Sequence, residues 1–227
     1  MQRAFTSTDM ASAKSIVVLL SGRGSNFQSL LNASRTDSLG GKINLVIANR
    51  PGAGGLEIAQ NAGIETALID HKNYASREAF DRDLAAAIET VSPDLVVLAG
   101  FMRILTPRFV ARFENRLMNI HPSLLPMYPG LHTHQRALDN GDSHAGATVH
   151  YVNGELDGGP PVLQARVAVC DGDSAETLAA RVLEVEHQIY PEAVNWHLTG
   201  RLSFEDGVLH KDKQPLPRTG CQWDGSK

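Results

Sequence analysis

The sequence predicts an α/β fold with a Rossmann-like, mostly parallel sheet flanked by helices and with antiparallel strands added in the C-terminal half. Short apolar runs such as "SIVVLL" (15–20) and "PDLVVLAG" (93–100) are typical of strands buried on both faces. Helical segments separate these runs, and strands that alternate with helices form a parallel sheet through right-handed crossovers. After residue 140 the alternation stops, because two strand-like runs follow each other without a helix.

In the first half of the chain, five strands are predicted, over residues 15–20, 43–49, 65–70, 93–100 and 116–121. One helix starts near Asn26, and a second covers 54–63, where Gly63 suits a left-handed C-terminal position. Ser76 is a candidate N-cap for a third helix, and Thr106 with Pro107 begins a fourth. The third helix has apolar residues on one face, at Phe80, Leu84, Ala87, Ile88 and Val91.

In the second half, strands are predicted over 146–152 and 161–169, and they are joined by the loop "NGELDGGP". A long helix is expected from about Ser174 to Thr199, with a bend near Pro191. We expect residues 1–14 to be a flexible N-terminal extension, 15–202 to be a single domain, and 203–227 to be a polar C-terminal tail, to which the sequence assigns no role.

The composition is that of an ordinary globular protein, with 42% hydrophobic and 20% charged residues. The formal net charge of −4 argues against a nucleic-acid partner, and no apolar run reaches the ~18 residues of a membrane span. Cys170 and Cys221 are too far apart in sequence to suggest a metal motif or a disulfide framework. We therefore expect a cytoplasmic protein, monomeric or homodimeric, whose partners are small molecules.

The stretch "NIHPSLLPMYPG" places Asn119 and His121 two residues apart, hence on one face of a strand that ends at Pro122. Ligands of open parallel sheets collect at the carboxyl ends of the strands. An amide and an imidazole there suit a carbonyl whose oxygen becomes negative during attack. The alternative is a capping asparagine beside a hydrogen-bonded core histidine, but the pairing on one face favours a functional role.

The loop "SGRGSN" follows the first strand, and its glycines allow a tight turn into a helix. The N–H groups of Gly24, Ser25 and Asn26 could bind a phosphate, with Arg23 nearby as a charge. A tight turn without a ligand is the alternative. A dinucleotide fingerprint would need glycine where Phe27 stands and an acid after the second strand, so a nicotinamide cofactor is disfavoured.

Two carboxylates and two histidines are further candidates. Asp157 in "ELDGGP" could orient His121 or could be an ordinary turn aspartate. Glu186 falls within the apolar stripe of the last helix, where a carboxylate needs a partner, either a substrate amine or a structural arginine. His132 and His134 have no carboxylate nearby in sequence, so we expect no metal site.

Taken together, these motifs resemble the folate-dependent formyltransferases. The resemblance runs from about Ser15 to Leu202 and rests on "SGRGSNFQSLL", "SREAFD", "DLVVLAGFMRIL", "NIHPSLLPMYPGLHTH", "ELDGGP" and "EHQIYP". It implies formyl transfer from 10-formyltetrahydrofolate as co-substrate, and the "SGxGSN" loop and short length favour the branch that acts on phosphoribosylglycinamide in purine synthesis. The remaining alternatives are a formyl-folate hydrolase, a formyltransferase that acts on a different amine, and a non-catalytic sensor of phosphorylated ligands.

The resemblance also implies roles for individual residues. The catalytic residues would be Asn119, His121 and Asp157. The residues that bind the phosphorylated substrate would be Gly24, Ser25, Asn26, Leu183, Glu184, Val185 and Glu186. The folate-binding residues would be Arg77, Met102, Arg103, Ile104, Leu105, Asn119, Asn153, Gly154, Glu155, Leu156 and Asp157.

Overall fold

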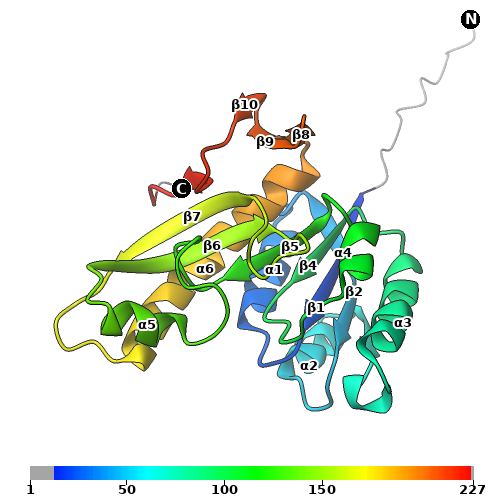
Figure 1. Cartoon of the computed structure of the whole chain (residues 1–227). Coiled ribbons are helices and arrows are strands. Elements are labelled where there is room, and N and C mark those ends of the chain that lie inside the picture. The colour runs from blue at the N-terminus through cyan, green and yellow to red at the C-terminus, as the bar shows by residue number, and fades with distance from the viewer. Residues whose placement is uncertain (1–12, 226–227) are drawn as a thin grey trace, which may run out of the picture.

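The computed structural model describes residues 13–225, and most of the extension expected at residues 1–14 lies outside this range. An eight-stranded sheet forms the middle layer, with the order β11-β7-β6-β5-β4-β1-β2-β3 (Figure 1). Its strands are β1 (Lys14–Leu20), β2 (Gly41–Ala48), β3 (Glu65–Leu68), β4 (Leu95–Leu98), β5 (Leu117–His121), β6 (His144–Tyr151), β7 (Pro161–Ala168) and β11 (Cys221–Gln222).

The pairing of the strands confirms the predicted sheet. Strands β3, β2, β1, β4 and β5 run parallel, whereas β6 pairs antiparallel with both β5 and β7. The short strand β11 lies parallel to β7, where Cys221 and Gln222 face Leu163 and Gln164. The strand order reverses between β1 and β4. In open α/β sheets the region outside the carboxyl ends of two such strands is the crevice where ligands usually bind.

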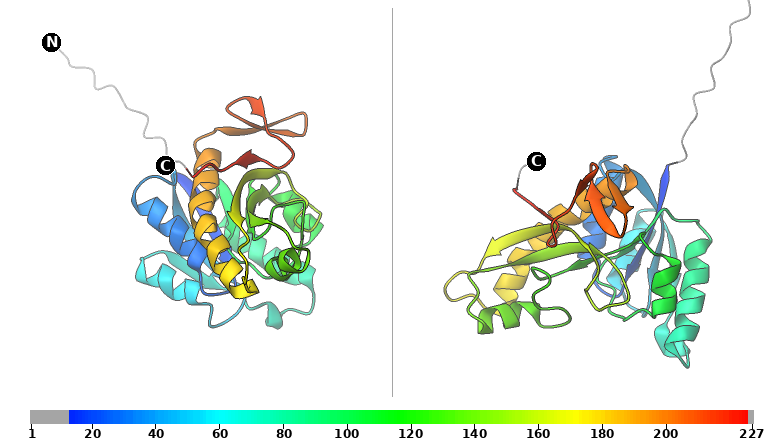
Figure 2. Two further views of the ribbon diagram at one scale, coloured as in Figure 1. Left: turned by 90° about the vertical axis from the view of Figure 1, so that its left-hand side faces the viewer. Right: turned by 45° about the horizontal axis from the view of Figure 1, so that its top comes forward.

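Helices cover the sheet on both faces. They are α1 (Ser25–Arg35), α2 (Gly54–Asn61), α3 (Arg77–Glu89), α4 (Pro107–Arg112), α5 (Thr133–Asp139) and α6 (Ala175–Leu198), with a 3-10 turn at His71–Asn73. Helices α1, α2 and α6 share one apolar cluster with the sheet, and α3 and α4 share the other (Figures 1 and 2). None of these helices has both the length and the apolar character needed to cross a membrane.

The predicted caps are confirmed. The Ser76 hydroxyl accepts the Ala79 N–H at 3.1 Å, and the Thr106 hydroxyl accepts the Phe109 N–H at 3.3 Å. Helix α6 continues through Pro191 as one element of 24 residues. The buried Tyr190 hydroxyl donates to the carbonyls of Leu98 and Met118, which ties α6 to β4 and β5 at the end of the sheet near the crevice.

The polar tail contains structure that the sequence analysis missed. Strands β8 (Leu202–Glu205), β9 (Val208–Lys211) and β10 (Gln214–Pro215) form a small antiparallel sheet above β7 (Figure 1). The turn between β8 and β9 has φ of 49° at Asp206 and 79° at Gly207. An Asp-Gly pair with two positive φ angles is the usual two-residue hairpin turn, so "EDGV" was the available signal.

Candidate active site

One face of β5 and β6 is polar. Asn119 lies opposite His150 in the pairing of these strands, and His121 lies opposite Thr148. Their alternate neighbours face α6 and are apolar, namely Met118, Ile120, Val149 and Tyr151. Two consecutive same-face positions of β5 are therefore polar, as predicted, and the strand β6 extends the polar face by two more side chains.

His121 is buried, with 5% of its surface exposed, and both of its ring nitrogens face acceptors. Nε2 lies 2.9 Å from the Tyr128 carbonyl oxygen, and Nδ1 lies 3.4 Å from Oδ2 of Asp157. A neutral imidazole has one N–H, so only the imidazolium can donate on both sides. An imidazolium would therefore find an acceptor at each ring nitrogen, with the Asn119 side chain on the same face of β5.

Asp157 comes to this face from the loop between β6 and β7. Its φ is 51°, a left-handed conformation that Asp adopts more readily than most residues. Besides facing His121, its Oδ2 accepts the Gly130 N–H at 2.8 Å, and Oδ1 lies 3.8 Å from Nε2 of His150. The structure therefore brings Asn119, His121 and Asp157 together around one point.

His150 belongs to the same cluster, and the sequence analysis missed it. Burial lowers its pKa to about 4, so the ring is neutral at pH 7. Its Nδ1 lies 2.8 Å from the Tyr151 carbonyl and must carry the proton, which leaves Nε2 to accept from the Asn119 amide at 3.2 Å. His150 thus fixes the orientation of Asn119. The alternating pattern of "GATVHYV" could have placed it on the polar face, since Val149 and Tyr151 flank it.

The glycine loop after β1 leads directly into α1. Gly24 is the N-cap residue with φ of 85°, and a Cβ there would lie 2.7 Å from the Gly55 Cα. Within the described part of the chain no side chain caps this helix start, so its first N–H groups could bind an anion. Ser25 and Asn26 are the first two residues of the helix, so the three residues predicted to donate N–H groups lie together at its start.

Glu186 faces inward, as predicted, but its partner is neither of the two expected groups. Asn26 donates from Nδ2 to Glu186 Oε2 at 2.6 Å, because α1 packs against α6. Burial raises the pKa of the Glu186 carboxyl above its ordinary value. On the preceding turn of α6, Leu183 and Val185 are half-buried and Glu184 is exposed. The glycine loop and this carboxylate are thus joined by a single side chain.

The segment after β4 exposes apolar side chains beside the crevice. Met102 is 70% exposed and Ile104 is 60% exposed, while the Arg103 guanidinium stacks 4.6 Å above the Phe80 ring. Leu105, next in the chain, packs against the cluster under α3 and α4. The Met102 N–H donates to the Ser21 hydroxyl at 2.8 Å, which fixes this segment to the end of β1. Exposed apolar groups held on a fixed backbone are typical of a ligand-binding surface.

The other two predicted folate-binding elements are Arg77 and the loop of residues 153–157. Arg77 is exposed in the first turn of α3. The loop of residues 153–157 is ordered by Asn153, whose Oδ1 accepts the Glu155 N–H at 2.9 Å and whose Nδ2 donates to the Gly158 carbonyl at 3.3 Å. Gly154 and Glu155 are exposed, and Leu156 is 59% exposed. Among the described residues, no hydrogen bond or ion pair joins Arg77 to this loop.

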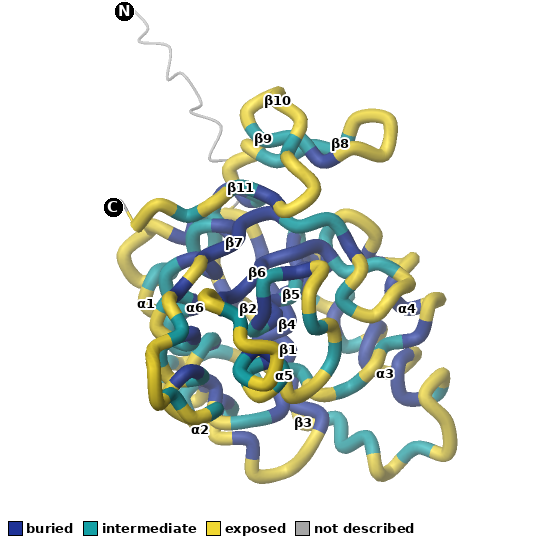
Figure 3. The backbone as a smooth tube through the Cα atoms, turned by 60° about the vertical axis from the view of Figure 1, so that its left-hand side comes forward, coloured by how far each residue is buried: buried dark blue, intermediate teal, exposed yellow. Residues whose placement is uncertain are grey.

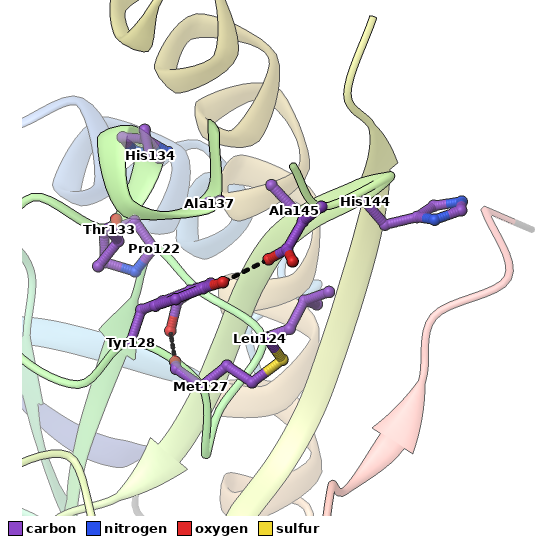
Figure 4. Close-up of a pocket in the computed structure, with 11 residues that line it drawn as sticks. Pro122, Leu124, Met127, Tyr128, Thr133, His134, Ala137, His144 and Ala145 are labelled. Carbon is purple, nitrogen blue, oxygen red and sulfur yellow. Dashed lines mark hydrogen bonds between the residues drawn. The ribbon is translucent and has the colours of Figure 1, made fainter. Parts of the chain in front are cut away.

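His132 and His134 lie at the start of α5. His132 is the exposed N-cap residue, and His134 is half-buried beside a water-sized cavity of about 10 Å³ (Figure 4). Burial lowers the pKa of His134, and its Nδ1 has no partner among the described residues. Over residues 13–225, no three His, Cys, Asp or Glu side chains are grouped as metal ligands.

Comparisons with known proteins show what the chain is similar to. The model of the formyl transferase family matches residues 14–194. A phosphoribosylglycinamide formyltransferase of Escherichia coli (strain K12) is 50% identical over 209 residues, which is 92% of this chain and 99% of that protein.

Solved structures show the same similarity. The phosphoribosylglycinamide formyltransferase of Coxiella burnetii, solved in complex with CHES, superposes with a TM-score of 0.89 and 44% identity over 93% of this chain and 100% of that one. A formyltetrahydrofolate deformylase of Pseudomonas syringae superposes with a TM-score of 0.82 and 27% identity, over 88% of this chain but 66% of that one.

Proposed function

The chain belongs to the formyl transferase family, and on this premise we propose that it transfers the formyl group of 10-formyltetrahydrofolate directly to the amine of 5'-phosphoribosylglycinamide. This is a step of purine (IMP) biosynthesis, and its products are formylglycinamide ribonucleotide and tetrahydrofolate. The similarity to named phosphoribosylglycinamide formyltransferases over nearly the whole chain supports this substrate. The observation that carries the proposal is the convergence of Asn119, His121 and Asp157 on one face of the sheet.

The reaction exchanges one carbon–nitrogen bond for another. The substrate amine attacks the formyl carbon, a tetrahedral intermediate forms, and the bond from that carbon to N10 of the folate breaks. The attacking nitrogen loses a proton and N10 gains one. The oxygen of the intermediate becomes negative, so donors fixed in advance around it lower the barrier.

Asn119 and His121 are the donors in this proposal. The Asn119 amide gives one N–H to His150 and keeps the second for the substrate oxygen. In this proposal the His121 imidazolium adds positive charge beside the Asn119 amide. Its Nε2–H donates to the Tyr128 carbonyl, so a direct hydrogen bond to the substrate oxygen would require that N–H to be shared between the two acceptors. Such preorganised groups act strongly because they need no rearrangement as charge develops.

Asp157 positions the imidazolium and helps the proton to move. Its carboxylate faces Nδ1 of His121 at 3.4 Å and stabilises the protonated ring. A water held by this carboxylate can take the proton from the attacking nitrogen and return one to N10. No covalent enzyme intermediate is needed, and we assign none.

The ribonucleotide is held by two elements. We assign the phosphate to the N–H groups of Gly24, Ser25 and Asn26 at the start of α1. The glycinamide end lies along α6, at residues 183–186, where Glu186 accepts from the substrate amine. The bond between Asn26 and Glu186 links the two halves of this subsite.

The formyl-folate is held on the other side of the crevice. We assign the pterin to the surface made by residues 102–105 and the loop 153–157, and the acidic end to Arg77. Stacking and backbone donors suit a flat heterocycle, whereas an exposed guanidinium suits a carboxylate. The partners we infer are these two small molecules, in the cytoplasm, for a chain that works as a monomer or homodimer.

One assay tests the proposal. The purified protein is mixed with synthetic ribonucleotide and formyl-folate, and the deformylated folate is followed by absorbance. We expect turnover only when both substrates are present. Turnover without the ribonucleotide would identify a hydrolase instead, which the similarity to a deformylase makes the relevant alternative. No turnover in either case would favour a sensor.

A further inference from the structure

A second cavity, of about 390 Å³, lies between the loop after Asp157 and the C-terminal strands. Its walls include Leu125, Pro126, Pro160, Leu209, Leu216 and Arg218. This volume is within the range of small-molecule sites, and the walls are predominantly apolar, as such sites usually are. The proposed transfer reaction makes no use of it.

Backbone contacts fix the shape of the cavity. A Cβ on Gly159 would lie 1.9 Å from the Tyr151 carbonyl oxygen, so this part of the loop lies directly against β6. Gly220, with φ of 73°, also lies against the backbone, since a Cβ there would come within 2.8 Å of the Val162 carbonyl carbon. The Leu216 N–H donates to the Leu209 carbonyl at 2.8 Å. The walls are therefore preformed.

The cavity is distinct from the proposed folate and ribonucleotide subsites. Asp157 is the one lining residue that it shares with them, and the carboxylate of Asp157 is directed toward Gly130 and His121. Neither residues 102–105 nor α6 contribute to its walls. A ligand here would contact the back of the loop that holds Asp157.

Charge selects the class of ligand. Arg218 is the one basic residue among the described residues that line the cavity, it is exposed, and no hydrogen bond or ion pair within residues 13–225 engages it. An unpaired guanidinium at the edge of an apolar cavity favours a carboxylate attached to an apolar body. We propose that this cavity binds a small amphiphilic carboxylate, with its ring against Leu209, Leu216 and Pro126 and its carboxylate on Arg218.

Calorimetric titration with two matched probes tests this proposal. 2-Naphthoate has the ring and the charge, and 2-naphthalenemethanol has the ring alone. We expect the wild-type protein to bind 2-naphthoate more tightly than the alcohol. The exposed Arg218→Glu should weaken naphthoate binding by about fivefold, since an exposed ion pair is worth up to about 1 kcal/mol, and should leave the alcohol unchanged.

Leu216→Trp should fill the cavity and remove binding of both probes, while Leu68→Trp, on the exposed far strand β3, should change neither. Melting temperatures check that each variant is folded. Saturating 5,8-dideazafolate should not displace 2-naphthoate, whatever the outcome of the formyl-transfer assay. Displacement by that folate analogue, equal affinity for the two probes, or undiminished binding in Leu216→Trp would each overturn the proposal.

Discussion

The two halves of the large sheet differ in what covers them. In the parallel half, β1 and β4 are apolar on both faces, and helices lie over each face. In the half formed by β5, β6 and β7, whose residues are mostly buried (Figure 3), one face packs on α6, but the loop after β5 covers part of the other. There the Leu125 N–H donates to the Thr148 hydroxyl at 3.1 Å, and Gln164 donates to the Leu125 carbonyl at 3.0 Å.

This difference explains where the polar residues lie. A loop has backbone groups that need partners, so a sheet face under a loop must supply polar side chains. A face under a helix is instead filled with apolar side chains. The candidate active site lies where the sheet continues and its helical cover stops. Of the four predictions below, two test whether the polar face of β5 and β6 is functional or only structural, and two test Glu186 and Arg77, which the helices present around it.

The largest effect is expected from His121→Ala. Loss of the imidazolium should lower kcat by about 10²- to 10³-fold, the usual cost of removing a preorganised group that stabilises an oxyanion. Steady-state kinetics with both substrates measure it, with circular dichroism to confirm folding. His144→Ala, at an exposed position of β6, is the matched control and should retain wild-type kcat. A normal kcat in folded His121→Ala would show that the polar face of β5 and β6 has only a structural role.

His150 should make stability depend on pH. Its pKa is about 4 when folded against an ordinary 6.5, so the unfolded chain binds the proton first as the pH falls. The stability that this neutral ring supplies is complete above pH 6.5 and is lost between pH 6.5 and 4, by up to about 3 kcal/mol. Urea unfolding across this range should show a shallower decline in His150→Gln. Parallel curves would show that His150 does not titrate as proposed.

Glu186→Gln should separate stability from binding. Burial raises the folded pKa of this carboxyl, so its contribution to stability is greatest below its ordinary pKa of 4.5 and falls as the pH rises through the folded value. The variant should therefore gain stability relative to wild type from pH 4 to pH 8. Its KM for the ribonucleotide should rise about tenfold or more, because a charged hydrogen-bond partner is lost.

The exposed Glu57→Gln on α2 is the control for that experiment and should change neither quantity. An unchanged KM in Glu186→Gln would show that this carboxylate does not bind the substrate. Its inward position would then be explained only by its hydrogen bond with Asn26.

The smallest effect is expected from Arg77→Ala. An exposed guanidinium that meets a carboxylate contributes at most about 1 kcal/mol, so KM for the folate should rise by up to about fivefold with kcat unchanged. Raising the salt concentration should shrink the difference, since exposed charges are screened. Arg82→Ala, exposed on the same helix, should leave KM as in wild type. An equal rise in both variants would remove the specific role of Arg77.

Much of the fold was accessible from the sequence because local patterns determine it. Continuous apolar runs identified β1 and β4, and the caps at Ser76 and Thr106 identified the starts of α3 and α4. The strands of the tail were not predicted, because β10 and β11 have two residues each, too few to show any periodicity. These strands form only because β9 and β7 offer them partners.

The site was accessible in part for the same reason. Asn119 and His121 are near in sequence, so strand geometry alone placed them together. The approach of Asp157 to His121 depends on a loop held in a left-handed conformation, and the role of His150 depends on the register between β5 and β6. The bond between Asn26 and Glu186 depends on two helices packing together. These three contacts therefore cannot be predicted from the spacing of residues in the sequence.

The short pairing of β11 with β7 leaves part of the sheet margin uncovered. Among residues 13–225, β11 reaches only Leu163 and Gln164, and the strand beyond them ends at Ala168, whose carbonyl accepts from Arg181. A free margin of this kind invites strand addition by another chain and hence aggregation. Arg166 is exposed on this stretch, and a charged side chain at a sheet margin opposes such addition.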